Sequence, residues 1–237
     1  MVNIPDLIVF DVNETLSDLA PLGEAFEKEG VAAGLSRTWF AGILRDGFAV
    51  TATGGNTGFT EIAKDSLHRL LSEHGVTAPE ESVERIMGTF KSLDVHPDVV
   101  PGIKALRQVA ELITLTNGAT QVAETLLSSA GVREHFSELL SVEDAPAWKP
   151  ARSAYDYAAT HRGTDPHDML LIAVHPWDIH GAHEAGLRTA WINRTGAQYP
   201  AYFARPDLEA ADLPSLADQL TAEGDSSGKP AQRDSRP

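Results

Sequence analysis

An acidic side chain directly follows the first apolar run of this chain. The run Leu7–Phe10 ends at Asp11, and Thr15 stands four residues further on. Such a run is typical of a buried strand, and reacting groups gather at the carboxyl ends of strands in parallel sheets. A carboxylate in that position can attack an electrophilic carbon or phosphorus atom. Asp11 is therefore the first candidate for a nucleophile.

Polar side chains also follow three later apolar runs. They are Thr116 with Asn117, then Lys149, then the segment from His175 to Asp178. All strands of a parallel sheet end at the same edge, so we expect these groups to meet Asp11 in one crevice. These groups are far apart in the sequence, but the topology of the sheet is expected to bring them together. They therefore predict one reaction site.

Each group has a plausible task in that site. Thr15 and Thr116 are predicted to hold oxygens of Asp11 or of a substrate carboxylate. Lys149 is predicted to keep Asp11 ionised, because an opposite charge within about 4–6 Å lowers the pKa of a carboxyl group. Asp178 pairs with Lys149 or positions a water, and His175 is a candidate base near neutral pH.

The elements that position these groups alternate along the chain. The apolar runs that predict strands are Leu7–Phe10, Leu112–Leu115, Leu139–Val142, Met169–Val174 and Thr189–Ile192. The helical patterns between and after them are Gly102–Ala110, Thr120–Ala130, Arg152–His161 and Ile179–Ala185. Pro101 is expected to open a helix, and Gly131 and Gly186 to end helices. This alternation predicts an α/β fold with a parallel sheet wrapped by helices.

One segment breaks the alternation, because residues 17–96 show helical periodicity and no convincing strand. Four helices are expected there, marked by Phe26, by Trp39 with Ile43, by Leu67 and by Ile86. We interpret residues 17–96 as a helical domain inserted into a core formed by residues 1–16 and 97–222. Residues 223–237, rich in Gly, Ser and charged residues, are expected to be a disordered tail.

Composition limits the possible partners. The 19 Lys and Arg residues against 34 Asp and Glu residues give a formal net charge of −15, which disfavours nucleic acid and anionic membranes as partners. The absence of cysteine excludes disulfides, zinc thiolate sites and cysteine nucleophiles. We find neither a signal peptide nor an apolar run of membrane-spanning length, so a cytoplasmic protein is expected.

At these residues the chain resembles the haloacid dehalogenase superfamily. The matching motifs are Phe10–Leu16, Leu115–Gly118, Trp148–Pro150, Trp177 with Asp178, and Gly181 to Gly186. Ala190–Arg194, and Tyr155 six residues after Lys149, are similar to the type II 2-haloacid dehalogenase branch in particular. The resemblance implies a Rossmann-like core, a helical cap domain and an aspartyl-ester mechanism. It also implies a small halogenated carboxylic acid as the partner, and a homodimer as one possible assembly.

Two departures favour one reaction of this superfamily over another. Its phosphatases carry a general-acid Asp two residues after the nucleophile and acidic metal ligands in the last motif, where this chain has Asn13 and Val174. A hard cation such as Mg²⁺ needs such carboxylates, whereas halide displacement from carbon does not. We therefore predict a hydrolase that removes halide from short 2-haloalkanoic acids with no metal and no cofactor. The alternatives are a phosphatase with a degraded metal site and a non-catalytic binding protein.

The substrate contacts implied by the resemblance are Asn13, Phe40, Thr116, Asn117, Tyr155 and Trp177. Family enzymes place an Arg at the position of Phe40, and either Arg37 or Arg45 could reach the site in its place. Glu14 replaces a usual Gly, and His175 replaces a usual Asn. Each of these residues also has a packing or capping interpretation; Asp178, for example, could cap a helix that begins at Ile179.

Overall fold

The computed structural model describes the backbone of residues 4–227 and the side chains of residues 4–222. Its centre is a six-stranded sheet, parallel throughout, with the strand order β3-β2-β1-β4-β5-β6. The strands are β1 (Leu7–Phe10), β2 (Glu111–Thr116), β3 (Glu138–Ser141), β4 (Met169–Ala173), β5 (Arg188–Ile192) and β6 (Leu208–Ala210). This order places the topological switch point between β1 and β4, which pair through the neighbours Phe10 and Ile172.

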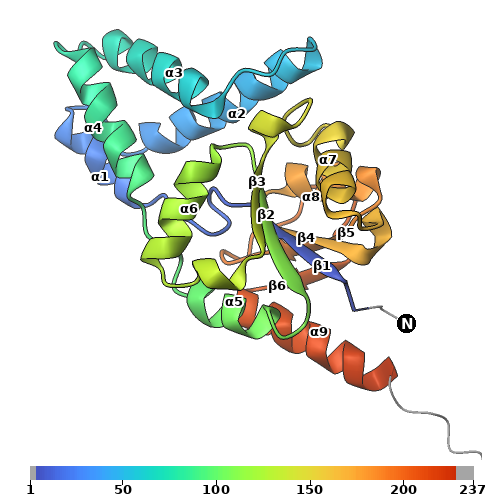
Figure 1. Cartoon of the computed structure of the whole chain (residues 1–237). Helices are drawn as coiled ribbons and strands as arrows, with labels where there is room; N and C mark the ends of the chain where they lie inside the picture. The colour runs from blue at the N-terminus through green and yellow to red at the C-terminus, as the bar shows by residue number, and fades with distance from the viewer. Residues whose placement is uncertain (1–3, 228–237) are drawn as a thin grey trace, which may run out of the picture.

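Helices cover both faces of this sheet (Figure 1). On one face, α5 (Val99–Leu106), α6 (Thr120–Ser129) and α9 (Leu213–Ser227) pack with Ile8 and Phe10 of β1. On the other, α7 (Arg152–Arg162) and α8 (Pro176–Ala185) pack with Val9. Short 3-10 helices occupy Arg133–His135, Val142–Asp144 and Pro166–Asp168. The fully buried β1 reads as a continuous apolar run because both of its faces are covered.

A layer of four helices, which we call the cap, lies between β1 and β2 in the chain, together with α5. They are α1 (Pro21–Lys28), α2 (Leu35–Ala52), α3 (Phe59–Glu73) and α4 (Pro79–Lys91). Figure 1 shows them as a separate layer beyond one end of the sheet. The chain leaves and re-enters the core side by side, because Ser17 and Val95 form an antiparallel bridge.

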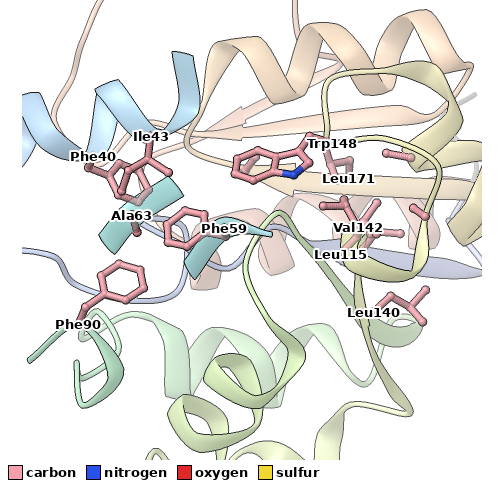
Figure 2. Close-up of a cluster of buried hydrophobic side chains, with 14 of the residues drawn as sticks. Phe40, Ile43, Phe59, Ala63, Phe90, Leu115, Leu140, Val142, Trp148 and Leu171 are labelled. Atoms are coloured by element: carbon pink, nitrogen blue, oxygen red, sulfur yellow. The ribbon is translucent and has the colours of Figure 1, made fainter. Parts of the chain in front are cut away.

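Aromatic side chains join the cap to the core next to the predicted site. The ring of Phe59 stacks on Phe90 of the cap at 5.6 Å and on Trp148 of the core at 5.9 Å (Figure 2). The indole nitrogen of Trp148 donates a hydrogen bond to the carbonyl of Thr57 at 3.0 Å. Since Trp148 directly precedes Lys149, this contact fixes the position of the cap relative to the predicted site.

Close approach of α2 to Trp148 leads to a stability prediction. A Cβ added at Gly47 would lie 2.4 Å from Cζ3 of Trp148. Gly47→Ala should therefore lower the free energy of unfolding by about 1–3 kcal/mol, because a packed indole must shift. Gly42, in the same helix, has no atom within 4 Å of such a Cβ, so Gly42→Ala should instead raise it by roughly 0.5–1 kcal/mol. Urea unfolding of both variants checks this, and equal effects would contradict it.

The predicted α/β class is confirmed, and the expected strands and helices are present with shifted ends. The chain also forms β6 and α9, which the sequence patterns did not indicate. Helix α5 begins at Val99, so Pro101 occupies its third position and does not open it; its missing N–H is one of the donors that lack a helical partner anyway. α8 begins at Pro176, which places Asp178 inside the first turn rather than at the cap.

The boundary of the tail also differs from the expectation. Helix α9 continues through residues 223–227, where we expected disorder. The buried side chains of Leu213, Leu216 and Leu220 anchor this helix, and adding residues to an existing helix is far easier than nucleating one. The remaining expected tail, 228–237, lies outside the described residues. No helix within residues 4–227 is long and apolar enough to cross a membrane.

Candidate active site

Asp11 lies at the switch point of the sheet, immediately after the central strand β1. Its backbone N–H donates to the carbonyl of Ile172 on β4 at 3.1 Å, and its residue surface is only 4% exposed. Of the groups predicted to converge here, Thr15, Lys149 and His175 lie against this carboxylate, and Asp178 shares Lys149 with it.

A buried ammonium group bridges two buried carboxylates. The Nζ atom of Lys149 donates to Oδ1 of Asp11 at 3.0 Å and to Oδ2 of Asp178 at 2.6 Å. The side chains of Lys149 and Asp178 are completely inaccessible to solvent. A buried ammonium is stable only when it is paired, and here it has two carboxylate partners.

The pKa values of the two carboxyl groups in this cluster are shifted in opposite directions. Burial raises the pKa of Asp11, but Lys149, His175 and the Thr15 hydroxyl outweigh it, so the pKa of Asp11 lies below its usual value. Burial and repulsion by Asp11 raise the pKa of Asp178 against the attraction of Lys149. Asp11 is therefore the ionised group suited to attack, and Asp178 is the better proton acceptor.

The hydroxyl of Thr15 orients the nucleophile. It donates to Oδ2 of Asp11 at 2.6 Å and accepts from the N–H of Val174 at 3.1 Å. Because its oxygen accepts from a fixed N–H at the end of β4, its hydrogen points to Asp11. This placement agrees with the first of the two roles predicted for Thr15.

The side chains after β2 position the lysine. The amide oxygen of Asn117 accepts from the N–H of Lys149 at 2.9 Å, and its amide nitrogen donates to the Lys149 carbonyl at 3.0 Å. The hydroxyl of Thr116 accepts from the N–H of Gly118 at 2.9 Å. The structure thus places Asn117 against the Lys149 backbone and Thr116 against its own turn, although we expected both to contact substrate.

Tyr155 likewise contacts the protein. Its hydroxyl donates to Oδ1 of Asp178 at 2.6 Å, and the residue is fully buried. Burial and the Asp178 charge raise the pKa of Tyr155 well above its usual value, so the phenol stays a donor. Both oxygens of Asp178 are therefore occupied, one by Tyr155 and one by Lys149.

His175 caps α8 and faces three oxygen atoms through one ring nitrogen. Its Nε2 lies 3.2 Å from the carbonyl of Asn13, 3.5 Å from Oε2 of Glu14 and 3.7 Å from Oδ2 of Asp11. A carbonyl only accepts hydrogen bonds, so we assign the hydrogen to Nε2. The ring lies between Phe40 and Trp177, with centroids 6.5 and 5.1 Å away.

A cleft of about 810 Å³ opens beside this histidine. Glu14, Arg37, Phe40 and His175 line it together with residues of the loop after β5. Arg45, the other candidate cation, is paired with Asp46 at 2.8 Å and its side chain is 74% exposed. The cleft therefore presents Arg37, not Arg45, to an anionic ligand. A separate cavity of about 10 Å³, lined by Asn13 and Thr116 among others, has room for little more than one water.

Mg²⁺ does not fit the residues around Asp11. Lys149 already lies between the two carboxylates, and Val174 adds an apolar side chain at the end of β4. Within the described part of the chain, no group of three His, Cys, Asp or Glu side chains is arranged to hold a metal ion.

Glu14 is the site residue that sequence reasoning missed. In the sequence it stands out only as a replacement for Gly, yet its side chain contacts His175 and lines the cleft. Burial and nearby Asp11 raise the pKa of Glu14 against the opposing charge of His175. The φ of Glu14 is +62°, a conformation that favours glycine. The signal in the sequence was therefore the replacement itself, because a Gly position that needs positive φ rarely accepts another residue.

Together, the switch-point aspartate, its buried lysine and the layer of four helices define a hydrolase with a Rossmann-like core and a cap. The chain belongs to the haloacid dehalogenase-like hydrolase family, whose model matches residues 5–186. It is 29% identical to haloacetate dehalogenase H-2 of Moraxella sp. (strain B) over 86% of this chain and 92% of that protein. It is 26% identical to (S)-2-haloacid dehalogenase H-109 of Pseudomonas putida, over 90% and 96%.

A solved structure supports the same relationship. An L-2-haloacid dehalogenase superposes with a TM-score of 0.86 at 25% identity, covering 92% of this chain and all of the other. The predicted membership of this superfamily, with its similarity to the 2-haloacid dehalogenase branch, is confirmed.

Proposed function

We propose that this protein is a hydrolytic dehalogenase of short 2-haloalkanoic acids that uses Asp11 as its nucleophile and needs no metal. The observation that supports this most strongly is a buried Asp11 that Lys149 and Thr15 keep ionised. A partly desolvated carboxylate is a far better nucleophile toward carbon than one in water. The relatives named as haloacetate and (S)-2-haloacid dehalogenases support the same substrate class.

In the first step, an oxygen of Asp11 attacks the carbon that bears the halogen. The carbon–halogen bond breaks in line with the new carbon–oxygen bond, and halide leaves with the bonding electron pair. Thr15 and Lys149 hold the carboxylate in one orientation, which reduces the entropic cost of reaching the transition state. The product of this step is an ester between Asp11 and the acid.

In the second step, water hydrolyses this ester at the Asp11 carbonyl. The ester bond breaks, the 2-hydroxy acid leaves and Asp11 returns as a carboxylate. Lys149 remains beside the Asp11 carbonyl, where its charge stabilises the oxyanion that forms during hydrolysis. A base must accept a proton from the water, and His175 and Asp178 are the two candidates.

Recognition of the substrate carboxylate is assigned to Arg37. It lines the cleft beside His175, where its charge acts on Glu14, and within residues 4–222 no carboxylate lies within 4 Å of its guanidinium group. An arginine can bind a carboxylate through two parallel hydrogen bonds. A local cation is needed because the net charge of −15 repels anions at long range.

Halide release measured by ion chromatography tests the proposal. The protein is incubated in excess EDTA with fluoroacetate, chloroacetate and each enantiomer of 2-chloropropionate. We expect halide release from at least one of these acids, undiminished by the chelator. Arg37→Ala should raise KM about tenfold, the loss of one charged hydrogen-bonded contact.

Arg45→Ala is the matched control, since Arg45 is exposed and paired with Asp46; its KM should stay within about twofold of the wild-type value. No halide release together with Mg²⁺-dependent phosphate release from phosphate monoesters would replace the proposal with a phosphatase. Binding of haloacids without any turnover would identify a binding protein.

A further inference from the structure

Arg194 lies two residues after β5, and the proposed mechanism gives it no task. Its Nε and Nη2 atoms donate to the two carboxylate oxygens of Asp98, each at 3.0 Å. Nη2 also donates to the backbone carbonyl of Thr15 at 3.0 Å. The side chains of Arg194 and Asp98 are only 18% and 15% exposed. Pairing with a carboxylate through two hydrogen bonds fixes the plane of the guanidinium group, so its donor to Thr15 has one direction.

The Asp98 side chain holds this arginine and not its own helix. Asp98 is the N-cap residue of α5, where an aspartate side chain usually accepts from an N–H of the first turn, but it makes no such bond. Its Oδ2 atom accepts instead from the N–H of Leu213, the first residue of α9, at 3.1 Å. Asp98 is therefore held from a second direction, and it anchors Arg194.

The turn that follows β1 is held by three successive carbonyl groups, those of Glu14, Thr15 and Leu16. Glu14 accepts from Nε2 of His96 at 2.9 Å, and Leu16 accepts from the N–H of His96 at 3.0 Å. The donor to the middle carbonyl, that of Thr15, is Arg194. Arg194 thus holds the backbone of the residue whose hydroxyl orients the nucleophile.

Thr15 transmits this placement to Asp11. Its hydroxyl donates to Oδ2 of Asp11 at 2.6 Å, so a shift of the Thr15 backbone would move the donor that fixes the attacking carboxylate. Misplacing a reacting group by about 1 Å can slow a reaction by about 10²-fold, even when the cause lies far from the reacting atoms.

We propose that Arg194 is a positioning residue for the attack on carbon: it holds the Thr15 backbone and, through the Thr15 hydroxyl, sets the orientation of Asp11. Asp98 is its anchor. This inference rests on the proposed function, because it concerns the first step of that reaction.

Single-turnover halide release, with protein in saturating excess over chloroacetate, measures the attack step apart from hydrolysis of the ester. Arg194→Met removes the donors and keeps an apolar side chain, and it should slow this step by about 10–10²-fold. The protein concentration that gives half the maximal rate should stay within about twofold of the wild-type value. A large rise in that concentration at an unchanged maximal rate would make Arg194 a substrate contact and overturn the inference.

Thr15→Val provides a readout that a purely structural role would not move, because it removes the hydroxyl and nearly keeps the shape. Two residues that act through one contact have effects that do not multiply. In a Thr15→Val background, Arg194→Met should therefore slow the attack step by no more than about threefold further. Slowing by the same factor as in the wild-type background would overturn the inference.

Arg162→Met is the matched control for lost stability. Arg162 also bridges two carboxylates, those of Glu111 and Glu138, and its side chain is 22% exposed. These two residues begin β2 and β3, at the end of the sheet opposite Asp11. The melting temperature of Arg162→Met should fall, while its attack rate should stay within about twofold of the wild-type value.

Arg194→Lys covers the case in which Arg194→Met fails to fold, because it keeps a cation beside Asp98. An ammonium group lacks the planar fork that reaches both Asp98 and the Thr15 carbonyl, so the attack step should still be slowed about fivefold or more. A wild-type attack rate in Arg194→Lys would overturn the inference. A wild-type protein that releases no halide from any haloacid tested would instead refute the proposed function.

Discussion

Asp11→Asn should reduce halide release by about 10⁴-fold or more, because the variant has no carboxylate to attack carbon. The amide has nearly the shape of the carboxylate and can still accept from Thr15, so the fold should be kept. The unfolding free energy at pH 7 should stay within about 1 kcal/mol of the wild-type value or rise above it. The cluster of Asp11, Lys149 and Asp178 carries a net charge of −1, and the substitution makes it neutral.

Initial halide release rates and urea unfolding of the same preparation check both parts of this prediction. Asp46→Asn is a matched control, because this carboxylate lies on the cap surface and its partners are Arg45 and Arg69. It should leave turnover within about twofold of the wild-type value. Substantial halide release by Asp11→Asn would contradict the nucleophile assignment.

Lys149→Met should lower the free energy of unfolding by about 3–5 kcal/mol at pH 7 and abolish turnover. Removing the Lys149 ammonium leaves two buried carboxylates without their shared cation. Breaking a buried ion pair by removing one partner is strongly destabilising. Lys64→Met, which removes an exposed partner of Glu84, should cost less than about 1 kcal/mol.

The loss of unfolding free energy in Lys149→Met, which we call its stability deficit, should depend on pH in a defined direction. Without Lys149, burial and mutual repulsion raise the pKa of Asp11 and Asp178 in the folded variant above their unfolded values. A folded state that binds more protons than the unfolded state loses stability as pH rises through those raised pKa values. The deficit should therefore be smallest near pH 4 and grow toward pH 7. A deficit independent of pH would contradict the burial of an uncompensated pair.

Much of the core was predictable because its signals are local. β1 and β4 are buried on both faces, so they read as uninterrupted apolar runs that end at Asp11 and near His175. Parallel topology then brings those ends together without any knowledge of distant contacts. β6 was not predictable in the same way, because it has three residues and only Ala210 is buried. Helix α9 was not predicted because the residues of its last turn are mostly polar.

The site was predictable in its charges but not in its contacts. Asp11, Lys149 and Asp178 meet as expected, since each follows a strand of the same sheet. Asn117 and Tyr155 were expected to contact substrate, but the structure uses their polar atoms to hold Lys149 and Asp178. Such pairings join residues 23 or 32 positions apart, and no periodicity encodes them.

The central claim is that the substrate is joined to Asp11, and isotope transfer in a single turnover tests it most directly. Protein in excess over chloroacetate reacts in water enriched in the heavy isotope of oxygen, and mass spectrometry follows both products. We predict that the heavy isotope enters the Asp11 carboxylate, whereas the hydroxyl oxygen of glycolate is unlabelled because it comes from Asp11. Heavy oxygen in the glycolate hydroxyl with none in Asp11 would mean that water attacks the carbon directly, and would contradict the account.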